Sequence, residues 1–194
     1  MDFVRSAYRA VAARWGRHLL PAMLAAQTPR AAFDSTGVDA AAVLDLYRGH
    51  KPDISLPWRS LYTLASLHNR GCPLAVITDG RSVTQRNKLE ALGIGRFVDK
   101  EDVFISEEVG ASKVSGEAFG RVMSRYPGRD YVYVGDNPAK DFAPARRLGW
   151  DTVCLLDAGD NVHAQEFDAV APECLPSRRI HSLTDILDIF DING

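Results

Sequence analysis

The first third of the chain has the hydrophobic spacing of helices. Apolar side chains recur every three or four positions across residues 3–15, and residues 19–26 form a second apolar helical stretch. Residues 40–47 are rich in helix formers, and the Gly- and Pro-containing stretch at residues 49–53 then interrupts the pattern. We therefore predict a small all-helical subdomain over residues 1–52.

From residue 57 onward, helical segments alternate with short apolar runs. The run Leu-Ala-Val-Ile at residues 74–77, bounded by Pro73 and Asp79, is typical of a strand buried on both faces. The repeated strand-then-helix cycle predicts an α/β core over residues 53–194, in which a Rossmann-like parallel sheet is covered by helices on both faces. The predicted strands are residues 74–77, 103–105, 131–134, 152–156 and 179–181, and the predicted helices are residues 61–67, 82–92, 117–126, 138–148 and 184–190.

The composition is that of an ordinary globular protein. Of the 194 residues, 46% are hydrophobic and 25% are charged, which excludes intrinsic disorder. A net charge of −2 gives no long-range field for nucleic acid or anionic lipid, and no apolar run approaches the ~20 residues that span a bilayer. Charged residues near the start argue against a signal peptide, and three cysteines without a CxxC pair indicate a reduced, cytoplasmic location.

Side chains suited to phosphate follow the first two predicted strands. Thr78, Asp79 and Gly80 come directly after the first strand, where a hydroxyl and the amides of a turn suit an anion. Lys113 follows the second strand and can neutralise a phosphoryl oxygen. Each residue also has a structural explanation, since Thr78 can cap the turn, Gly80 can supply a positive φ and Lys113 can be solvated. Their position at one edge of the sheet favours a phosphate site.

Two carboxylates follow the third predicted strand. Asn137 suits a helix N-cap and Pro138 the first helical position, so Asp136 falls in the loop and Asp141 in the early helix. Two carboxylates at this edge make an oxygen site of the kind that Mg²⁺ takes. Alternatively, Asp141 complements the helix dipole and Asp136 is a second capping group. The pattern favours the metal site.

These segments resemble three motifs of the haloacid dehalogenase superfamily of phosphohydrolases. Residues 74–93 resemble the second motif with its helix, and residues 133–141 match the fourth motif closely. Lys113, followed six residues later by Phe119, resembles the third motif, although members usually have Pro where this chain has Val114. The resemblance implies a capped member of the family.

The resemblance runs from about residue 2 to residue 156 and includes a helical cap, but the family's first motif is missing. The helical segments of residues 1–52 resemble the cap that members insert between the first and second motifs. The first motif is a strand ending in Asp-x-Asp-x-Thr, and its leading Asp is the nucleophile. Its one candidate here is Asp34, which follows no buried strand, so we do not assign it as the nucleophile.

The resemblance places that missing strand at the centre of the sheet, between the strands that end at Thr78 and Val134. A sheet without it has two unpaired edges, which the chain must close, cover by forming a homodimer or fill with a borrowed segment. Because Met1 to Arg9 resembles the segment that follows the first motif, we expect residues upstream of Met1 to encode the strand. The chain is then N-terminally truncated and lacks its nucleophile.

The resemblance implies a Mg²⁺-dependent phosphatase that hydrolyses a small phosphorylated metabolite through an aspartyl-phosphate. In that role Asp136 binds the metal with help from Asp141, and Thr78 and Lys113 hold the phosphoryl group. With so few carboxylates, Mg²⁺ binding by this chain is expected to be weak. The alternative is a catalytically inactive scaffold or interaction module. A nucleotide-binding domain is disfavoured because no GxGxxG or GxxxxGK[ST] follows a strand.

Overall fold

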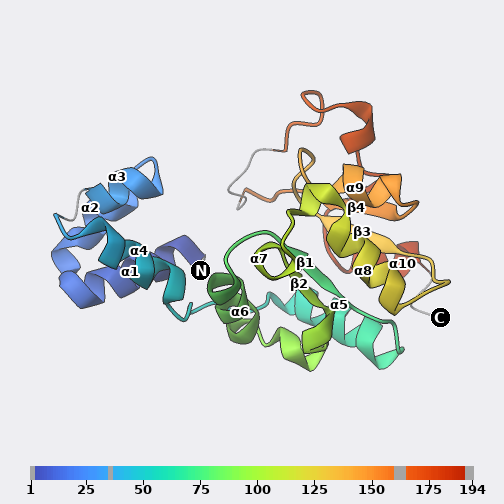
Figure 1. The fold of residues 1–194 in the computed structure, drawn as a ribbon, viewed down its shortest axis with the longest axis horizontal. Helices are drawn as coiled ribbons and strands as arrows, with labels where there is room; N and C mark the ends of the chain where they lie inside the picture. Colours follow the sequence, from blue (N-terminus) through green and yellow to red (C-terminus); the bar gives the residue numbers. More distant parts are fainter. Residues whose placement is uncertain (1–2, 35–36, 160–164, 191–194) are drawn as a thin grey trace. The chain divides into compact units, whose positions relative to one another are not determined.

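The computed structural model describes residues 3–34, 37–159 and 165–190 (Figure 1). Its contacts divide the chain into two compact units, Met1–Leu56 with Gly80–Gly95 and Pro57–Asp79 with Arg96–Gly194. The predicted domains, residues 1–52 and 53–194, are a different division and stay a prediction. No helix within the described ranges is both long and apolar enough to cross a membrane.

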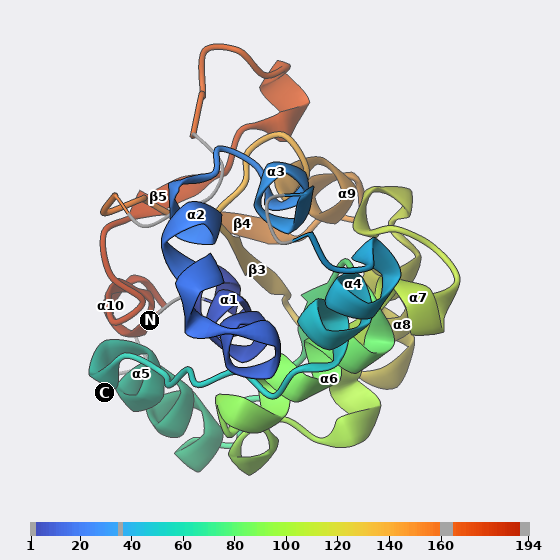
Figure 2. The ribbon, with the colours of Figure 1, turned by 90° about the vertical axis from the view of Figure 1, so that its left-hand side faces the viewer.

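The first unit is built from helices, and α1 to α4 face the viewer in Figure 2. Its helices are α1 (Phe3–Trp15), α2 (Leu20–Ala25), α3 (Pro29–Asp34), α4 (Ala40–Gly49) and α6 (Ser82–Ala91), with the 3₁₀ turns η1 (Arg17–Leu19) before α2 and η2 (Ile94–Arg96) after α6. The apolar spacing of α1 buries Tyr8 and Val11 against Met23 of α2 and Val43 of α4. The predicted helices at residues 3–15 and 40–47 are therefore confirmed.

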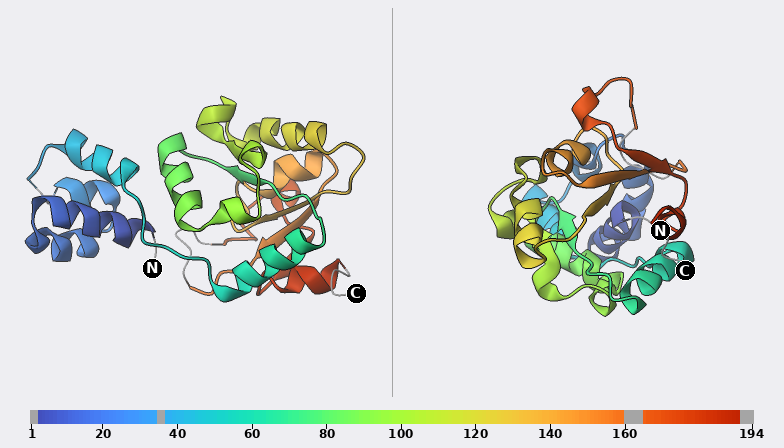
Figure 3. Two further views of the ribbon diagram at one scale, coloured as in Figure 1. Left: turned by 90° about the horizontal axis from the view of Figure 1, so that it is seen from below. Right: turned by 90° about the vertical axis from the view of Figure 1, so that its right-hand side faces the viewer.

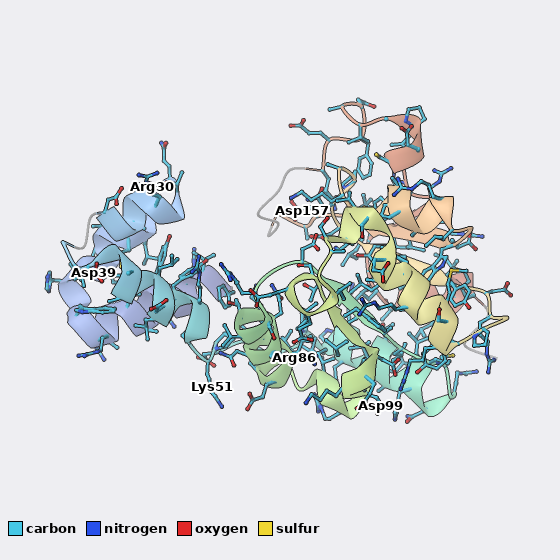
Figure 4. The ribbon with its side chains drawn as sticks, viewed as in Figure 1. Arg30, Asp39, Lys51, Arg86, Asp99 and Asp157 are labelled. Carbon is cyan, nitrogen blue, oxygen red and sulfur yellow. The ribbon has the colours of Figure 1, made fainter. Side chains whose placement is uncertain are left out.

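Polar side chains fix the ends of α4 in this unit. Asp39 accepts a hydrogen bond from the backbone N–H of Ala42 at 3.1 Å, which caps the N-terminus of the helix (Figure 4). At the other end, the Thr84 hydroxyl of α6 donates to the backbone carbonyl of Arg48 at 2.9 Å. One of the carbonyls that a helix leaves unpaired at its C-terminus is thus bound from α6.

Among its described residues, the second unit has five strands in two parallel sheets. One sheet pairs β1 with β2, and the other has the order β3-β4-β5. The register sets Thr78 of β1 beside Ile105 of β2, and Gly135 of β3 beside Cys154 of β4. The strands are β1 (Val76–Thr78), β2 (Val103–Ile105), β3 (Val132–Gly135), β4 (Asp151–Leu155) and β5 (Arg178–Ile180).

Helices cover both faces of the larger sheet, as Figure 3 shows on its right. Tyr133 packs with α8 and α9 in a cluster around Phe119, whereas the next residue, Val134, packs with α10 in a cluster around Ile186. Successive residues of a strand point to opposite faces, so the two clusters lie on opposite sides of the sheet. The predicted α/β fold is confirmed. The helices of this unit are α5 (Trp58–Asn69), α7 (Ser106–Val109), α8 (Glu117–Arg125), α9 (Phe142–Arg147) and α10 (Asp185–Ile189), with the 3₁₀ turns η3 (Lys100–Asp102), η4 (Lys113–Ser115) and η5 (Pro172–Cys174).

The two sheets share one layer of helices although they do not pair with each other. Ile77 of β1, Phe104 of β2 and Tyr133 of β3 all pack against the buried cluster around Phe119 of α8. Within the described residues, β1 pairs only with β2 and β3 only with β4. Each of the two strands therefore has one unpaired edge, and the break lies between β1 and β3, the place expected for the missing strand.

Several element bounds differ from the predictions. The first strand is Val76–Thr78 rather than residues 74–77, and α9 begins at Phe142 rather than at residue 138. The short helices α3 and α7 were not predicted, because four to six residues show too little periodicity. Four residues lie outside the described ranges: Met1 and Asp2, at the start of the segment that resembles the one after the first motif, and Ser35 and Thr36, which follow Asp34.

Candidate functional site

The candidate site lies where the strands of the second unit end. Thr78 is the last residue of β1, and Asp79 follows it directly. Asp136 follows β3 in the same way, and Lys113 begins η4, the turn after β2 and α7. In a parallel sheet the carboxyl ends of neighbouring strands share an edge, which is where ligands bind in α/β proteins.

A buried ion pair joins Lys113 to Asp141. The Lys113 ammonium donates to Oδ1 of Asp141 at 2.7 Å, and the two side chains are only 14% and 3% exposed. The backbone N–H of Lys113 donates in turn to Oδ1 of Asp79 at 2.8 Å. Lys113 thereby connects the residue after β1 to the turn that follows β3, across the break between the two sheets.

The other oxygen of Asp141 organises the loop after β3. Oδ2 accepts hydrogen bonds from the backbone N–H of Asp136 at 3.0 Å and from that of Asn137 at 2.9 Å. This approach needs the glycine at position 135, because a Cβ there would lie 2.5 Å from Oδ2 of Asp141. Both carboxylate oxygens of Asp141 are thus engaged by groups of the protein.

The prediction that a helix begins at residue 138 and contains Asp141 is wrong. Asn137 and Pro138 do not open the helix; residues 138–140 form a turn, and Asp141 immediately precedes α9. Asn137 instead caps this turn, since its Oδ1 accepts from the N–H of Ala139 at 3.1 Å and its carbonyl accepts from the N–H of Asp141 at 2.9 Å. Asp141 therefore precedes the helix and turns back toward the loop.

The environment shifts the pKa values of three groups near the pair. Burial alone would lower the pKa of Lys113, but Tyr133 and the Asp141 carboxylate outweigh burial and raise that pKa above its ordinary value. Burial, together with the charge of Asp141, raises the pKa of Tyr133 to about 12. Burial, followed by the charge of Asp136, raises the pKa of the Cys154 thiol to about 11. At neutral pH the lysine is cationic, while the phenol and the thiol are uncharged.

Gly80 and Asp34 belong to the first unit and are not part of this network, and Thr78 is connected to it as the residue that precedes Asp79. Gly80 has a φ of +140°, and a Cβ there would lie 2.6 Å from the Gln85 amide nitrogen, so the position requires glycine. Asp34 is the last residue of α3, its side chain is 68% exposed, and its carboxylate lies 4.0 Å from Arg30. A residue at the end of an exposed helix does not match a nucleophile that follows a buried strand.

Sequence reasoning missed Gln165, which also reaches this edge. Its amide nitrogen donates to the backbone carbonyl of Asp136 at 2.7 Å and to that of Leu155, the last residue of β4, at 2.8 Å. Gln165 lies outside any helix or strand. No local pattern could have singled it out, since its partners precede it by 29 and 10 residues.

The donor chemistry suits a hard cation, but the number of ligands is small. Asp136 is exposed at the strand end and offers the carboxylate oxygen that Mg²⁺ prefers. Among the described residues, no group of three or more His, Cys, Asp or Glu side chains is arranged to hold a metal. Asp141 is already bound to Lys113 and to two backbone amides. The residues fit a site that needs further oxygen ligands.

Known proteins resemble this chain in sequence and in structure. The family model for haloacid dehalogenase-like hydrolases matches residues 2–149. A glyceraldehyde 3-phosphate phosphatase from Methanocaldococcus jannaschii is 36% identical over 132 residues, which are 67% of this chain and 54% of that protein. A ribulose-1,5-bisphosphate 5-phosphatase from Halopiger xanaduensis is 30% identical over 154 residues, which are 78% of this chain and 64% of that protein. The chain thus spans between half and two thirds of these relatives.

Solved structures have the same fold. The crystal structure of the HAD-hydrolase YfnB from Bacillus subtilis, bound to magnesium, superimposes with a TM-score of 0.64 at 22% identity. The match covers 95% of this chain and 82% of that one. At this level of identity the likeness establishes the fold alone.

Proposed function

The chain belongs to the haloacid dehalogenase-like hydrolases, and we propose that it serves the Mg²⁺-dependent hydrolysis of a small phosphomonoester. Two relatives that are at least 30% identical bear the names of phosphatases for small phosphorylated compounds. The observation that carries the proposal is the placement of Lys113, held through Asp79 and Asp141 at the carboxyl ends of the strands.

In this proposal Lys113 binds the phosphoryl group. Its ammonium has three N–H donors, of which the bond to Asp141 uses one, and the raised pKa keeps the group charged at neutral pH. A cation fixed before the substrate arrives stabilises negative charge that builds up on phosphoryl oxygens. Thr78, at the end of β1, is proposed to donate its hydroxyl to another of these oxygens. Asp79 is proposed to complete the phosphate site through its backbone amide.

Asp136 is proposed as the ligand for Mg²⁺, and Asp141 as the residue that assists it by holding the loop. A bound Mg²⁺ would neutralise charge on the phosphate. Titration of the 194-residue chain with Mg²⁺ by calorimetry tests this assignment. Weak binding is expected, and Asp136→Asn should abolish it, whereas Asp130→Asn, at the opposite end of β3, should not. Equal binding by all three proteins would contradict the role of Asp136.

The nucleophile is proposed to come from residues outside this sequence. None of the five described strands ends in Asp-x-Asp-x-Thr, and β1 and β3 each have an unpaired edge beneath the shared helix α8. A strand between them would satisfy both edges and bring an Asp beside Lys113. The carboxylate would attack phosphorus, the ester P–O bond would break, and water would then hydrolyse the aspartyl-phosphate. A second copy of the chain or a borrowed segment that pairs with these edges is proposed as the other way to close the break.

The same observation supports a second candidate function. A chain whose described strands carry no nucleophile would serve as an inactive scaffold or interaction module. Assays with an aryl phosphate and Mg²⁺ discriminate the two functions when run on this chain and on a version extended upstream in its own reading frame. Turnover by the extended protein alone supports the phosphatase. A stop codon directly before Met1, with no turnover by this chain, supports the scaffold. Mg²⁺-dependent turnover by this chain that is lost in Asp34→Asn would overturn the assignment of the nucleophile.

A further inference from the structure

One side-chain amide ties the end of β3 to the end of β4. The Gln165 amide nitrogen donates to the Asp136 carbonyl at 2.7 Å and to the Leu155 carbonyl at 2.8 Å. Its oxygen accepts from the backbone N–H of Asp157 at 2.9 Å, in the loop after β4 where Figure 4 labels Asp157. Both amide hydrogens and the amide oxygen therefore have partners.

The orientation of this amide follows from its partners. If the amide were flipped, its oxygen would face the carbonyl oxygens of Asp136 and Leu155, and its nitrogen would face the N–H of Asp157. Each of the three hydrogen bonds would then be lost. The bond to the Leu155 carbonyl is also partly buried, so water does not fully replace it.

The peptide groups on both sides of Asp136 are held as a result. Its N–H donates to Oδ2 of Asp141 at 3.0 Å, and its carbonyl accepts from Gln165 at 2.7 Å. Fixing both peptide groups of a residue fixes its φ and ψ, and with them the direction of its Cα–Cβ bond. The Asp136 carboxylate is therefore presented at the sheet edge by a loop that is bound from two sides.

We infer that Gln165 is a positioning residue for Asp136, acting through the backbone of the loop after β3. The role of Asp136 as a metal ligand rests on the proposed function, whereas the hydrogen bonds that hold its loop are observed in the structure. Residues that orient a metal ligand contribute to metal affinity without touching the metal. Gln165 contacts the Asp136 side of the site and has no hydrogen bond with Lys113 among the described residues.

The test compares the chain with Gln165→Met, which keeps the length and bulk of the side chain but has no amide. Residue-specific amide exchange, measured by NMR, should accelerate at least about 10-fold at Asp136 and Asn137. Exchange in α8 should not change. Gln27→Met is the matched control, because Gln27 is exposed and lies in the first unit.

Ligand titrations supply a readout that a merely structural role would not produce. In Gln165→Met the dissociation constant for Mg²⁺ should rise about 10-fold, while that for inorganic phosphate should stay unchanged. Equal weakening of both ligands, or unchanged exchange at Asp136 and Asn137, would overturn the inference. If exchange accelerates locally but the unsubstituted chain binds no Mg²⁺, the metal assignment fails and the positioning of the loop stands.

Discussion

Lys113 and Asp141 form a buried ion pair, with 2.7 Å between the ammonium nitrogen and Oδ1 and side-chain exposures of 14% and 3%. The ion pair between Lys51 and Glu90 has a separation of 3.2 Å, but its side chains are 77% and 68% exposed. Water and salt screen the exposed pair, whereas each member of the buried pair depends on the other for compensation of its charge. This contrast provides matched variants for measuring what the buried pair contributes.

Lys113→Met should destabilise the protein by roughly 3–5 kcal/mol, because it leaves the Asp141 carboxylate buried without its cation. Lys51→Met should cost less than about 1 kcal/mol, because its pair is solvated. Urea denaturation followed by circular dichroism measures both free energies of unfolding. Equal losses in the two variants would show that the buried pair has no special role.

Gly135→Ala should disrupt the loop after β3. The added Cβ would lie 2.5 Å from Oδ2 of Asp141, which must then move away from the amides of Asp136 and Asn137. We expect a loss of roughly 1–3 kcal/mol from the overpacking. Gly120→Ala is the control, because a Cβ in that part of α8 meets nothing within 4 Å and alanine favours a helix by about 0.5–1 kcal/mol. Thermal unfolding measures the stability of both variants, and an unchanged stability of Gly135→Ala would contradict the prediction.

Phe119→Ala should weaken the packing beneath both sheets. The Phe119 ring is fully buried, with its centre 5.0 Å from that of Tyr133 and 5.2 Å from that of Trp150. Truncation of a buried phenylalanine costs about 3–5 kcal/mol. The near-ultraviolet circular dichroism of the two neighbouring rings should fall as well. Val114→Ala, at a position that is 48% exposed, should change neither signal; an equal effect there would rule out a specific role for Phe119.

The free energy of unfolding should fall as the pH rises from about 10 to about 12, in part because of Tyr133. Its pKa is raised from 10.0 to about 12 in the folded protein, mainly by burial. Over that range the unfolded chain loses the phenolic proton while the folded protein retains it, so alkali favours unfolding. The contribution is fully present below pH 10 and is lost as the pH passes the folded pKa. Tyr133→Phe should therefore show a shallower decline in urea titrations at several pH values, and identical slopes would refute the assigned shift.

The sequence predicted the edge of the sheet where the candidate residues lie, but not the contacts among them. The order of strands and helices could be predicted because each strand is a short apolar run followed by a polar turn. That order placed Thr78, Lys113 and Asp136 after successive strands. The roles of Asp79 and Gln165 could not be predicted, because their hydrogen-bond partners lie 34 and 29 residues away in the chain.

By itself the sequence determined the parallel α/β fold and the order of its strands, because apolar periodicity and turn residues act over a few neighbouring positions. Only the tertiary structure decided that Asp141 precedes α9, that both its oxygens are engaged, and that Gly135 must lack a side chain. Oδ1 is engaged by a lysine 28 residues away, and Oδ2 by the way the loop after β3 folds back on Asp141. The break between β1 and β3 was expected from the family resemblance and not from local sequence, because the pairing of strand edges depends on segments that local sequence does not specify.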